Sequence, residues 1–150
     1  MISTRGRYAL RVMVDLAKNS QNEFITLKDI AKRQDISKKY LEQIIPIFNR
    51  ENMLIASRGY GGGYKLSKSP KEYTVGEILR LTESSLAPVA CLETKSNQCP
   101  RAGSCPTLFV WKGLQKVEEE YLNGITLQDI LDREIDLSGN DYNIWHGKTF

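Results

Sequence analysis

The sequence predicts a mainly α-helical fold that carries one small β-hairpin. Helix start signals precede three amphipathic segments within the first fifty residues. A glycine-rich stretch, RGYGGG, then separates two short strand-like runs, as in a hairpin with a flexible tip. A longer amphipathic segment follows near residues 107–122. Two short helices, a longer helix and a hairpin form the order of a winged helix-turn-helix, here extended by a long C-terminal dimerisation helix.

The first two helices are indicated by their N-caps. Ser3 and Thr4 can cap the first helix, and Thr26 with Asp29 forms a capping box for the second. The apolar residues of the first helix recur at the spacing of a single buried face: Ala9, Val12, Met13 and Leu16. The second helix has one apolar side as well, so both are predicted to pack on a shared core.

Ser37 caps the third predicted helix, which carries a proline. Its apolar side again follows the helical period, with Leu41, Ile44, Ile45 and Phe48. Pro46 lies within this pattern, where a proline removes a hydrogen bond and clashes with the preceding turn, at roughly 3 kcal/mol. We therefore expect a kink or an early stop near residue 45, followed by a second turn.

The second half of the chain is also predicted to be helical. Capping boxes at Thr74 and at TLQD open two short helices, and the 107–122 helix lies between them. This helix carries a heptad-like apolar seam of the kind that pairs helices: Val110, Leu114, Val117 and Tyr121. Three parts are expected: a winged helix-turn-helix domain (1–70), a dimerisation region with a cysteine loop (71–137, loop 84–106), and a flexible tail (138–150).

The overall net charge of +3 conceals a basic half and an acidic half. Residues 1–70 carry a net +7 and residues 71–150 a net −4, which favours contact of the first half with a polyanion, although uneven solvated surface gives the same pattern. No apolar run approaches the ~18–20 residues that span a bilayer, and no signal-peptide segment opens the sequence. We expect a cytoplasmic protein with reduced thiols, without a membrane partner.

The polar residues of the third helix and the hairpin are candidate DNA contacts. The second helix of a helix-turn-helix places its N-terminal residues in the major groove, where Gln, Glu and Ser can read base edges and Lys can bind phosphates. An arginine at the hairpin base would reach a phosphate or a narrow minor groove. The candidates are Arg7, Ser37, Lys38, Lys39, Tyr40, Glu42, Gln43, Arg58, Gly59, Tyr60 and Gly61. A module of the same shape that binds proteins remains an alternative.

All three cysteines lie within fifteen residues, CLETKSNQCPRAGSC. Cys91, Cys99 and Cys105 are separated by seven and five residues, which matches neither a zinc ribbon nor a bacterial ferredoxin run. An odd count argues against a closed disulfide set, and nearby Lys95 and Arg101 favour the thiolate. Spacing alone leaves an iron–sulfur cluster, a zinc ion and ordinary exposed thiols open. The single His146 lies in the tail and is interpreted as a bystander.

Five stretches of the sequence are similar to segments of one protein family. They are STRGRYALRVMVDLA, ISKKYLEQI, SRGYGGGYKLSK, VGEIL and NGITLQDIL. Through them the chain resembles, from residue 1 to about 137, the IscR/NsrR/CymR family of bacterial winged-helix regulators, and the third stretch, the wing, is the most specific. The resemblance implies a homodimer paired through the 107–122 helix that binds a pseudo-palindromic operator in double-stranded DNA. It also implies an iron–sulfur cluster, 2Fe–2S more than 4Fe–4S, held by Cys91, Cys99 and Cys105.

The chain departs from this family's pattern at the fourth cluster ligand. Leu108 stands where the 2Fe–2S branch has a histidine, and Tyr8 stands where the nitric-oxide-sensing branch has an aspartate. The fourth ligand is therefore unassigned; Asp15, Glu93, Thr107, a water or a small thiol could serve. An exchangeable fourth ligand would make the cluster labile, as suits a sensor, and the protein as purified could lack it.

Together these features predict a transcription repressor, not an enzyme, with no small-molecule substrate. Its operator affinity would be set by a cysteine-ligated iron–sulfur cluster that senses iron–sulfur, redox or nitric oxide status. The first alternative is a regulator of cysteine and sulfur metabolism with the same fold, which acts by thiol oxidation or through a partner protein. A more distant alternative is a zinc or iron–sulfur scaffold or electron-transfer protein without a DNA role.

Overall fold

The structure is a computed structural model that describes residues 1–20, 23–94 and 96–136. Six α-helices and a two-stranded antiparallel hairpin are formed by these residues, which confirms the predicted fold class. The elements are α1 (Thr4–Asn19), α2 (Leu27–Gln34), α3 (Lys38–Arg50), β1 (Leu54–Ser57), β2 (Gly63–Leu66), η1 (Pro70–Glu72), α4 (Val75–Thr82), η2 (Ala90–Leu92), α5 (Leu108–Asn123) and α6 (Leu127–Asp136). The predicted tail and His146 lie outside the described residues.

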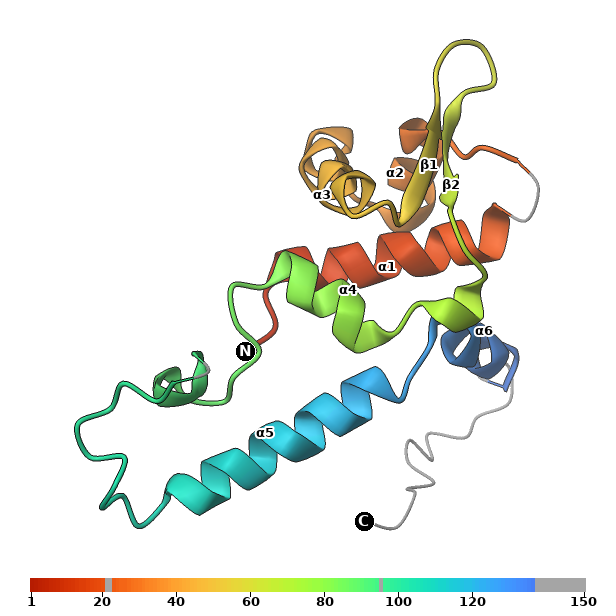
Figure 1. Cartoon of the computed structure of the whole chain (residues 1–150). Coiled ribbons are helices and arrows are strands. Elements are labelled where there is room, and N and C mark those ends of the chain that lie inside the picture. Colours follow the sequence, from red (N-terminus) through yellow and green to blue (C-terminus); the bar gives the residue numbers. More distant parts are fainter. Residues whose placement is uncertain (21–22, 95, 137–150) are drawn as a thin grey trace.

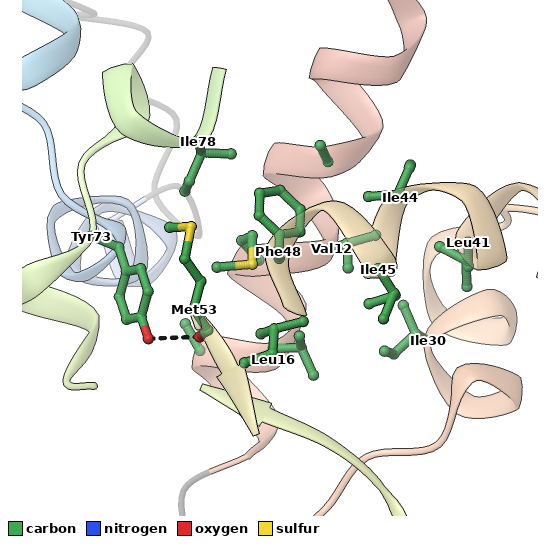
Figure 2. Packing of buried hydrophobic residues seen from close by; sticks show 14 of the residues in the cluster. Val12, Leu16, Ile30, Leu41, Ile44, Ile45, Phe48, Met53, Tyr73 and Ile78 are labelled. Carbon is green, nitrogen blue, oxygen red and sulfur yellow. Dashed lines mark hydrogen bonds between the residues drawn. The ribbon is translucent and has the colours of Figure 1, made fainter. Parts of the chain in front are cut away.

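The three N-terminal helices begin at the predicted caps. The side chains of Ser3, Thr26 and Ser37 accept hydrogen bonds from the backbone N–H groups three residues ahead. Their apolar faces meet in one core (Figure 2), whose fully buried members in α1 to α3 include Val12, Leu16, Ile30, Leu41, Ile44 and Phe48. The 3.6-residue spacing of the apolar residues therefore predicts both where the helices form and which of their faces are buried.

The predicted early stop at Pro46 is not observed. Helix α3 runs on from Lys38 to Arg50 with the proline inside it. Because proline has no N–H, the carbonyl of Glu42 lacks its usual helical hydrogen-bond donor at position 46. Both Pro46 and Glu42 are exposed. Water can satisfy that carbonyl, while Ile45 and Phe48 on the opposite side stay buried. Core packing therefore outweighs the local cost of the proline.

The hairpin forms between the two predicted strand-like runs. Leu54 pairs with Leu66 and Ser57 with Gly63, so residues 58–62 make up the tip. Gly59 and Gly61 have φ angles of +91° and +75°, which side-chain-bearing residues rarely adopt. The glycine-rich sequence is thus required by the backbone of the tip, and it lets the hairpin stand beside α3 as a wing (Figure 1).

Helices α4 and α6 both pack against α1 (Figure 1), and they complete the core with Ile78 and Leu127. The core thus continues past residue 70, where the sequence predicts a domain boundary, and the division into domains stays a prediction. Helices α1 to α4, the hairpin and α6 form the packed head of the molecule. Helix α5 instead projects away from this head, and none of its sixteen described residues is buried. Among the described residues, no helix is both long and apolar enough to span a bilayer.

Tyr73 connects the base of the wing to α4. Its side chain is 1% exposed, and its hydroxyl donates to the Met53 carbonyl at 2.8 Å (Figure 2) and accepts from the Lys68 N–H at 2.9 Å. Ser67 Oγ lies 3.0 Å from the same hydroxyl. One buried phenol therefore satisfies several polar groups between the hairpin and the second half of the chain.

Replacing Tyr73 with phenylalanine should destabilise the head, because the Lys68 N–H then loses its acceptor and the Met53 carbonyl keeps only the Ser67 N–H as a donor. Leaving such groups unsatisfied costs about 1–3 kcal/mol. Urea unfolding of Tyr73→Phe should show this loss in the free energy of unfolding, whereas Tyr60→Phe at the fully exposed wing tip should change it by less than about 0.5 kcal/mol. Equal stability of both variants would contradict the role assigned to the hydroxyl.

Candidate DNA interface and cysteine loop

The N-terminal turns of α3 present polar side chains to solvent. Ser37, Lys38, Lys39, Glu42 and Gln43 are exposed, and Tyr40 is half-buried. Lys38 Nζ lies 3.9 Å from Glu42 Oε1, an exposed pair that a nearby phosphate or base can separate at little cost. Ser37 already accepts the Tyr40 N–H as N-cap, so its hydroxyl remains able to donate. The predicted base-reading residues therefore share one accessible surface.

Tyr40 is held from behind by α1. The rings of Tyr8 and Tyr40 meet edge to face with centroids 5.5 Å apart, and the Arg11 guanidinium lies 5.4 Å from the centroid of Tyr8. Arg11 also donates to the side chain and the backbone carbonyl of Gln34, at the end of α2. No role was predicted for Arg11, yet it joins α1 to the turn that precedes α3, the predicted recognition helix.

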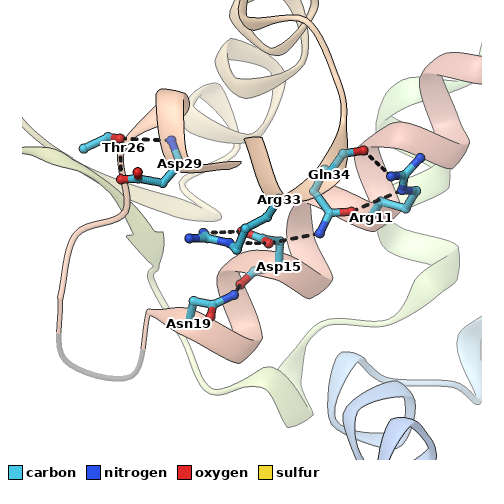
Figure 3. Close-up of polar contacts among 7 residues, drawn as sticks. All are labelled: Arg11, Asp15, Asn19, Thr26, Asp29, Arg33 and Gln34. Carbon is cyan, nitrogen blue, oxygen red and sulfur yellow. Dashed lines mark hydrogen bonds and ion pairs between the residues drawn. The ribbon is translucent and has the colours of Figure 1, made fainter. Parts of the chain in front are cut away.

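A buried carboxylate fixes α2 against α1 (Figure 3). Asp15 is 2% exposed, and it accepts hydrogen bonds from Arg33 at 2.9 and 2.7 Å and from Gln34 Nε2 at 3.0 Å. The hydrogen bond to Asp15, followed by its charge, raises the pKa of Arg33 despite partial burial. Asp15 is also one of the candidate fourth ligands, but its oxygens are enclosed and already paired, so it presents no open donor to a metal.

The Asp15 network is not among the features predicted from the sequence, although a signal for it was present. Asp15 lies three residues after Val12 and one before Leu16, so it shares the buried face of α1. A carboxylate at such a position must be paired. The basic residues at the end of α2, Lys32 and Arg33, were the available partners.

The wing and the start of α1 supply the remaining predicted contacts. Arg58, Gly59, Tyr60 and Gly61 are all exposed, and the Tyr60 side chain is fully so at the tip. Arg7 is exposed on α1, where it donates to Thr4 Oγ1 at 3.1 Å. The cysteines, by contrast, lie in the segment between α4 and α5, away from the recognition helix and the wing (Figure 1).

The three cysteines are free and partly exposed. Three thiols on one segment are the donor type of an iron–sulfur cluster, so the chemistry of the donor set fits one. Among the described residues, however, no group of three or more His, Cys, Asp or Glu side chains lies close enough together to hold a metal ion. None of the described residues from 84 to 106 is buried, so the loop can rearrange around a ligand with little loss of packing.

Cys105 stands apart from the other two thiols in its surroundings. Its Sγ lies 3.5 Å from Thr107 Oγ1. That hydrogen bond, then the backbone N–H of Thr107 and, more weakly, Leu108 N–H and the Arg101 charge, lower the pKa of the Cys105 thiol. Thr107 is thus the candidate fourth-ligand residue that contacts a cysteine, while Glu93 is exposed and Lys95 lies outside the described residues.

Helix α5 exposes an apolar stripe. Its members are Val110 (44%), Leu114 (47%), Val117 (41%) and Tyr121 (37%), and Phe109 beside them is 75% exposed. These are the residues of the predicted heptad-like seam. A contiguous apolar face on a projecting helix is typical of a surface that pairs with another chain.

A winged helix-turn-helix with an exposed basic and polar recognition helix defines a DNA-binding transcription regulator. A model of the Rrf2 family, described as an iron-dependent transcriptional regulator, matches residues 2–133. The HTH-type transcriptional regulator IscR of Cronobacter sakazakii is 32% identical over 150 residues, which cover 99% of this chain and 91% of that protein. The chain belongs to the Rrf2 family, whose members regulate transcription and are not enzymes.

Two solved structures are similar to most of the chain. T. potens IscR has a TM-score of 0.74 and 32% sequence identity, covering 97% of this chain and 96% of that one. CymR, the global cysteine regulator of B. subtilis, has a TM-score of 0.68 and 30% identity, covering 89% and 97%. The predicted family resemblance to IscR and CymR is thereby confirmed.

The pKa of Cys105 gives a test of the loop geometry. In metal-free protein with Cys91→Ser and Cys99→Ser, the pH midpoint of alkylation by iodoacetamide should lie below the ordinary thiol value of about 8.5. Thr107→Val removes the leading hydrogen bond and should move the midpoint to higher pH, because the thiolate loses its donor. Ser104→Ala is the matched control. Equal midpoints in all three proteins would refute the Thr107 contact.

Proposed function

We propose that this chain is a dimeric transcription repressor in which the state of the cysteine loop sets the affinity for a pseudo-palindromic operator. Cys91, Cys99 and Cys105 are the residues that would hold an iron–sulfur cluster. When bound, the cluster supplies a centre that oxidants, nitric oxide or iron shortage can remove. We place this activity in the cytoplasm, where thiols stay reduced. The observation that carries the proposal is the position of three free thiols between the DNA-binding head and α5.

Pairing through α5 is the first part of the proposal. The stripe of Val110, Leu114, Val117 and Tyr121 repeats every three or four residues, as a helix-pairing seam does. A second copy of the chain offers the same stripe, so a two-fold dimer buries both. Such a dimer presents two recognition helices, and an operator with matching two-fold symmetry is expected.

DNA readout by the N-terminal turns of α3 is the second part. Lys38 and Lys39 supply positive charge for phosphates, and Glu42 and Gln43 project from the same exposed side one turn on. The wing, with Arg58 and the exposed Tyr60, would contact the neighbouring groove or backbone. Arg7 lies on the same head at the start of α1.

Regulation by the cysteine loop is the third part of the proposal, and it rests on the position of the loop between α4 and α5. The loop follows α4, which packs on α1 in the head, and it precedes α5, which carries the dimer seam. Ordering the loop around a ligand would change how α5 projects from the head, and with it the spacing of two recognition helices. A coupling of about 1–3 kcal/mol, the usual range for allostery, corresponds to ~5–150-fold in operator affinity.

A second function is favoured by the separation of the thiols. Since the described residues form no three-ligand group, the chain can also respond through oxidation of individual thiols or through a partner protein. Its similarity to CymR, a cysteine regulator, supports this alternative. Iron and sulfide analysis after anaerobic purification separates the two, because only the first function requires both elements.

The contacts of α3 can be tested by their different effects on specificity. Lys39→Ala should weaken binding to all duplexes alike and reduce the slope of log affinity against log salt by about 1. Gln43→Ala should cost about 1–3 kcal/mol on the operator and relax the preference at one base pair. Lys116→Ala, an exposed lysine of α5, is the control. Equal slopes and preferences in all four proteins would contradict this face as the interface.

The dimer seam can be tested with a single carboxylate. Leu114→Asp places an unpaired charge in the seam and should raise the dimer dissociation constant by at least about tenfold, because burying it costs more than ~1.4 kcal/mol. Sedimentation equilibrium measures the constant. Lys112→Asp on the opposite side of α5 should leave it nearly unchanged. A monomeric wild-type protein, or a dimer insensitive to Leu114→Asp, would rule out this pairing.

The sensing function is tested by operator affinity with and without anaerobic iron–sulfur reconstitution. The wild-type affinity should change by ~5–150-fold, and Cys91→Ala with Cys99→Ala should abolish the change. Affinity in the metal-free state should be similar for both proteins. If reconstitution leaves wild-type affinity unaltered, the cluster-sensing function is wrong.

A further inference from the structure

Glu83 joins the start of the cysteine loop to the start of α1. Its Oε1 accepts hydrogen bonds from the Ser3 backbone N–H at 3.1 Å and from Ser3 Oγ at 2.7 Å. The two residues are 80 positions apart in the sequence. Glu83 directly follows α4 and precedes the 84–106 loop. The contact therefore connects the DNA-binding head with the first residue on the path to the cysteines.

The N-terminus of α1 relies on this distant carboxylate. The first turn of α1, described throughout, contains no acidic residue, and Arg5 and Arg7 lie close to its start. A helix N-terminus favours negative charge and disfavours positive charge. Ser3 caps α1 by accepting the Gly6 N–H at 3.1 Å, so Glu83 both supplies the missing charge and holds the capping residue in place.

Gly6 leaves the space that Glu83 occupies. Gly6 is buried inside α1, and a Cβ built on it would overlap the Glu83 carboxylate. The atom it would meet is the end of a flexible side chain and not backbone. A methyl group at position 6 would therefore displace Glu83 from α1 while leaving the helix itself intact.

The same junction lies against the recognition helix. Ser3, Arg5, Glu83, Ser84 and Tyr40 line one open surface pocket, where the starts of α1 and α3 meet the end of α4. Tyr8, two residues after Gly6, packs its ring on that of Tyr40, with centroids 5.5 Å apart. A shift of the first turn of α1 therefore reaches a predicted base-reading side chain through direct contacts.

We propose that Glu83 is a positioning residue that couples the cysteine loop to the recognition helix. With its carboxylate on Ser3, the first turn of α1 is fixed and the Tyr8–Tyr40 contact holds the start of α3. Movement of the loop withdraws Glu83 and releases that turn. This inference deepens the proposed function by naming the route of regulation. The contact itself exists in the protein without a metal, so it can be tested there.

Coupling of this kind is reciprocal, so DNA bound to α3 must also alter the loop. The test measures how fast N-ethylmaleimide labels the loop cysteines in metal-free full-length protein, with and without a saturating duplex selected by the wild-type protein. DNA should change the wild-type rate by at least about fivefold, whereas Glu83→Ala and Gly6→Ala should each reduce that effect below about twofold. Glu119→Ala on α5 should retain the full effect.

Folding alone would not give this pattern. Alanine is a better helix former than glycine, so Gly6→Ala and Glu83→Ala remove the contact with different effects on the stability of α1. Both should keep operator binding and a cooperative thermal transition. The proposal is overturned if DNA leaves the wild-type labelling rate unchanged, if both variants keep the full DNA effect, or if both lose operator binding with wild-type melting temperatures. Because no iron is present, none of these outcomes depends on cluster sensing.

Discussion

Burial of the Asp15 carboxylate is the constraint on which the DNA-binding head depends. A charged group that is 2% exposed is tolerated only if it is paired, and Arg33 and Gln34 provide the pairing from the end of α2. The position of α2 on α1 is therefore set by hydrogen-bond geometry as well as by apolar packing. Arg11 also donates to Gln34 (Figure 3), so both Asp15 and Arg11 of α1 hold Gln34, the last residue of α2 before the turn into α3.

With α2 fixed, the remaining elements divide into a head with a shared buried core and a projecting part made of the 84–106 loop and α5. Helices α3, α4 and α6 share the core with α1, and Tyr73 ties the wing base to α4. The cysteine loop and α5 contribute no buried residue among those described. This division suits a regulator of the Rrf2 family, because a signal can rearrange the exposed loop and α5 without unfolding the DNA-binding head. The contact of Glu83 with Ser3 joins the two parts at their boundary.

The local parts of this structure could be predicted from the sequence, and the long-range parts could not. The helix caps at Thr26 and Ser37 involve residues only three positions apart, so they can be predicted from a short stretch of sequence. Pro46 shows where such local prediction fails. The proline alone predicts an early end of α3, but packing of the buried face of α3 keeps the helix intact. The local pattern shows that Asp15 lies on the buried face of α1 and needs a partner, but it does not say which residue pairs with it. The approach of Glu83 to Ser3 depends on residues 80 positions apart, and no local pattern encodes it. The wing and the cysteines indicated the family, but the spacing of the thiols did not determine their arrangement in space.

If the cysteine loop regulates DNA binding, a change in the loop must reach the first turns of α1 and α3. Hydrogen–deuterium exchange of the metal-free and the anaerobically reconstituted protein tests it most directly, because backbone amides report local opening in each element. Protection should change in the loop at 84–106 and also in the first turn of α1 and the N-terminal turn of α3, while the buried amide of Ile30 in α2 should be unchanged. Changes confined to the loop, with both of those turns unaffected, would contradict it.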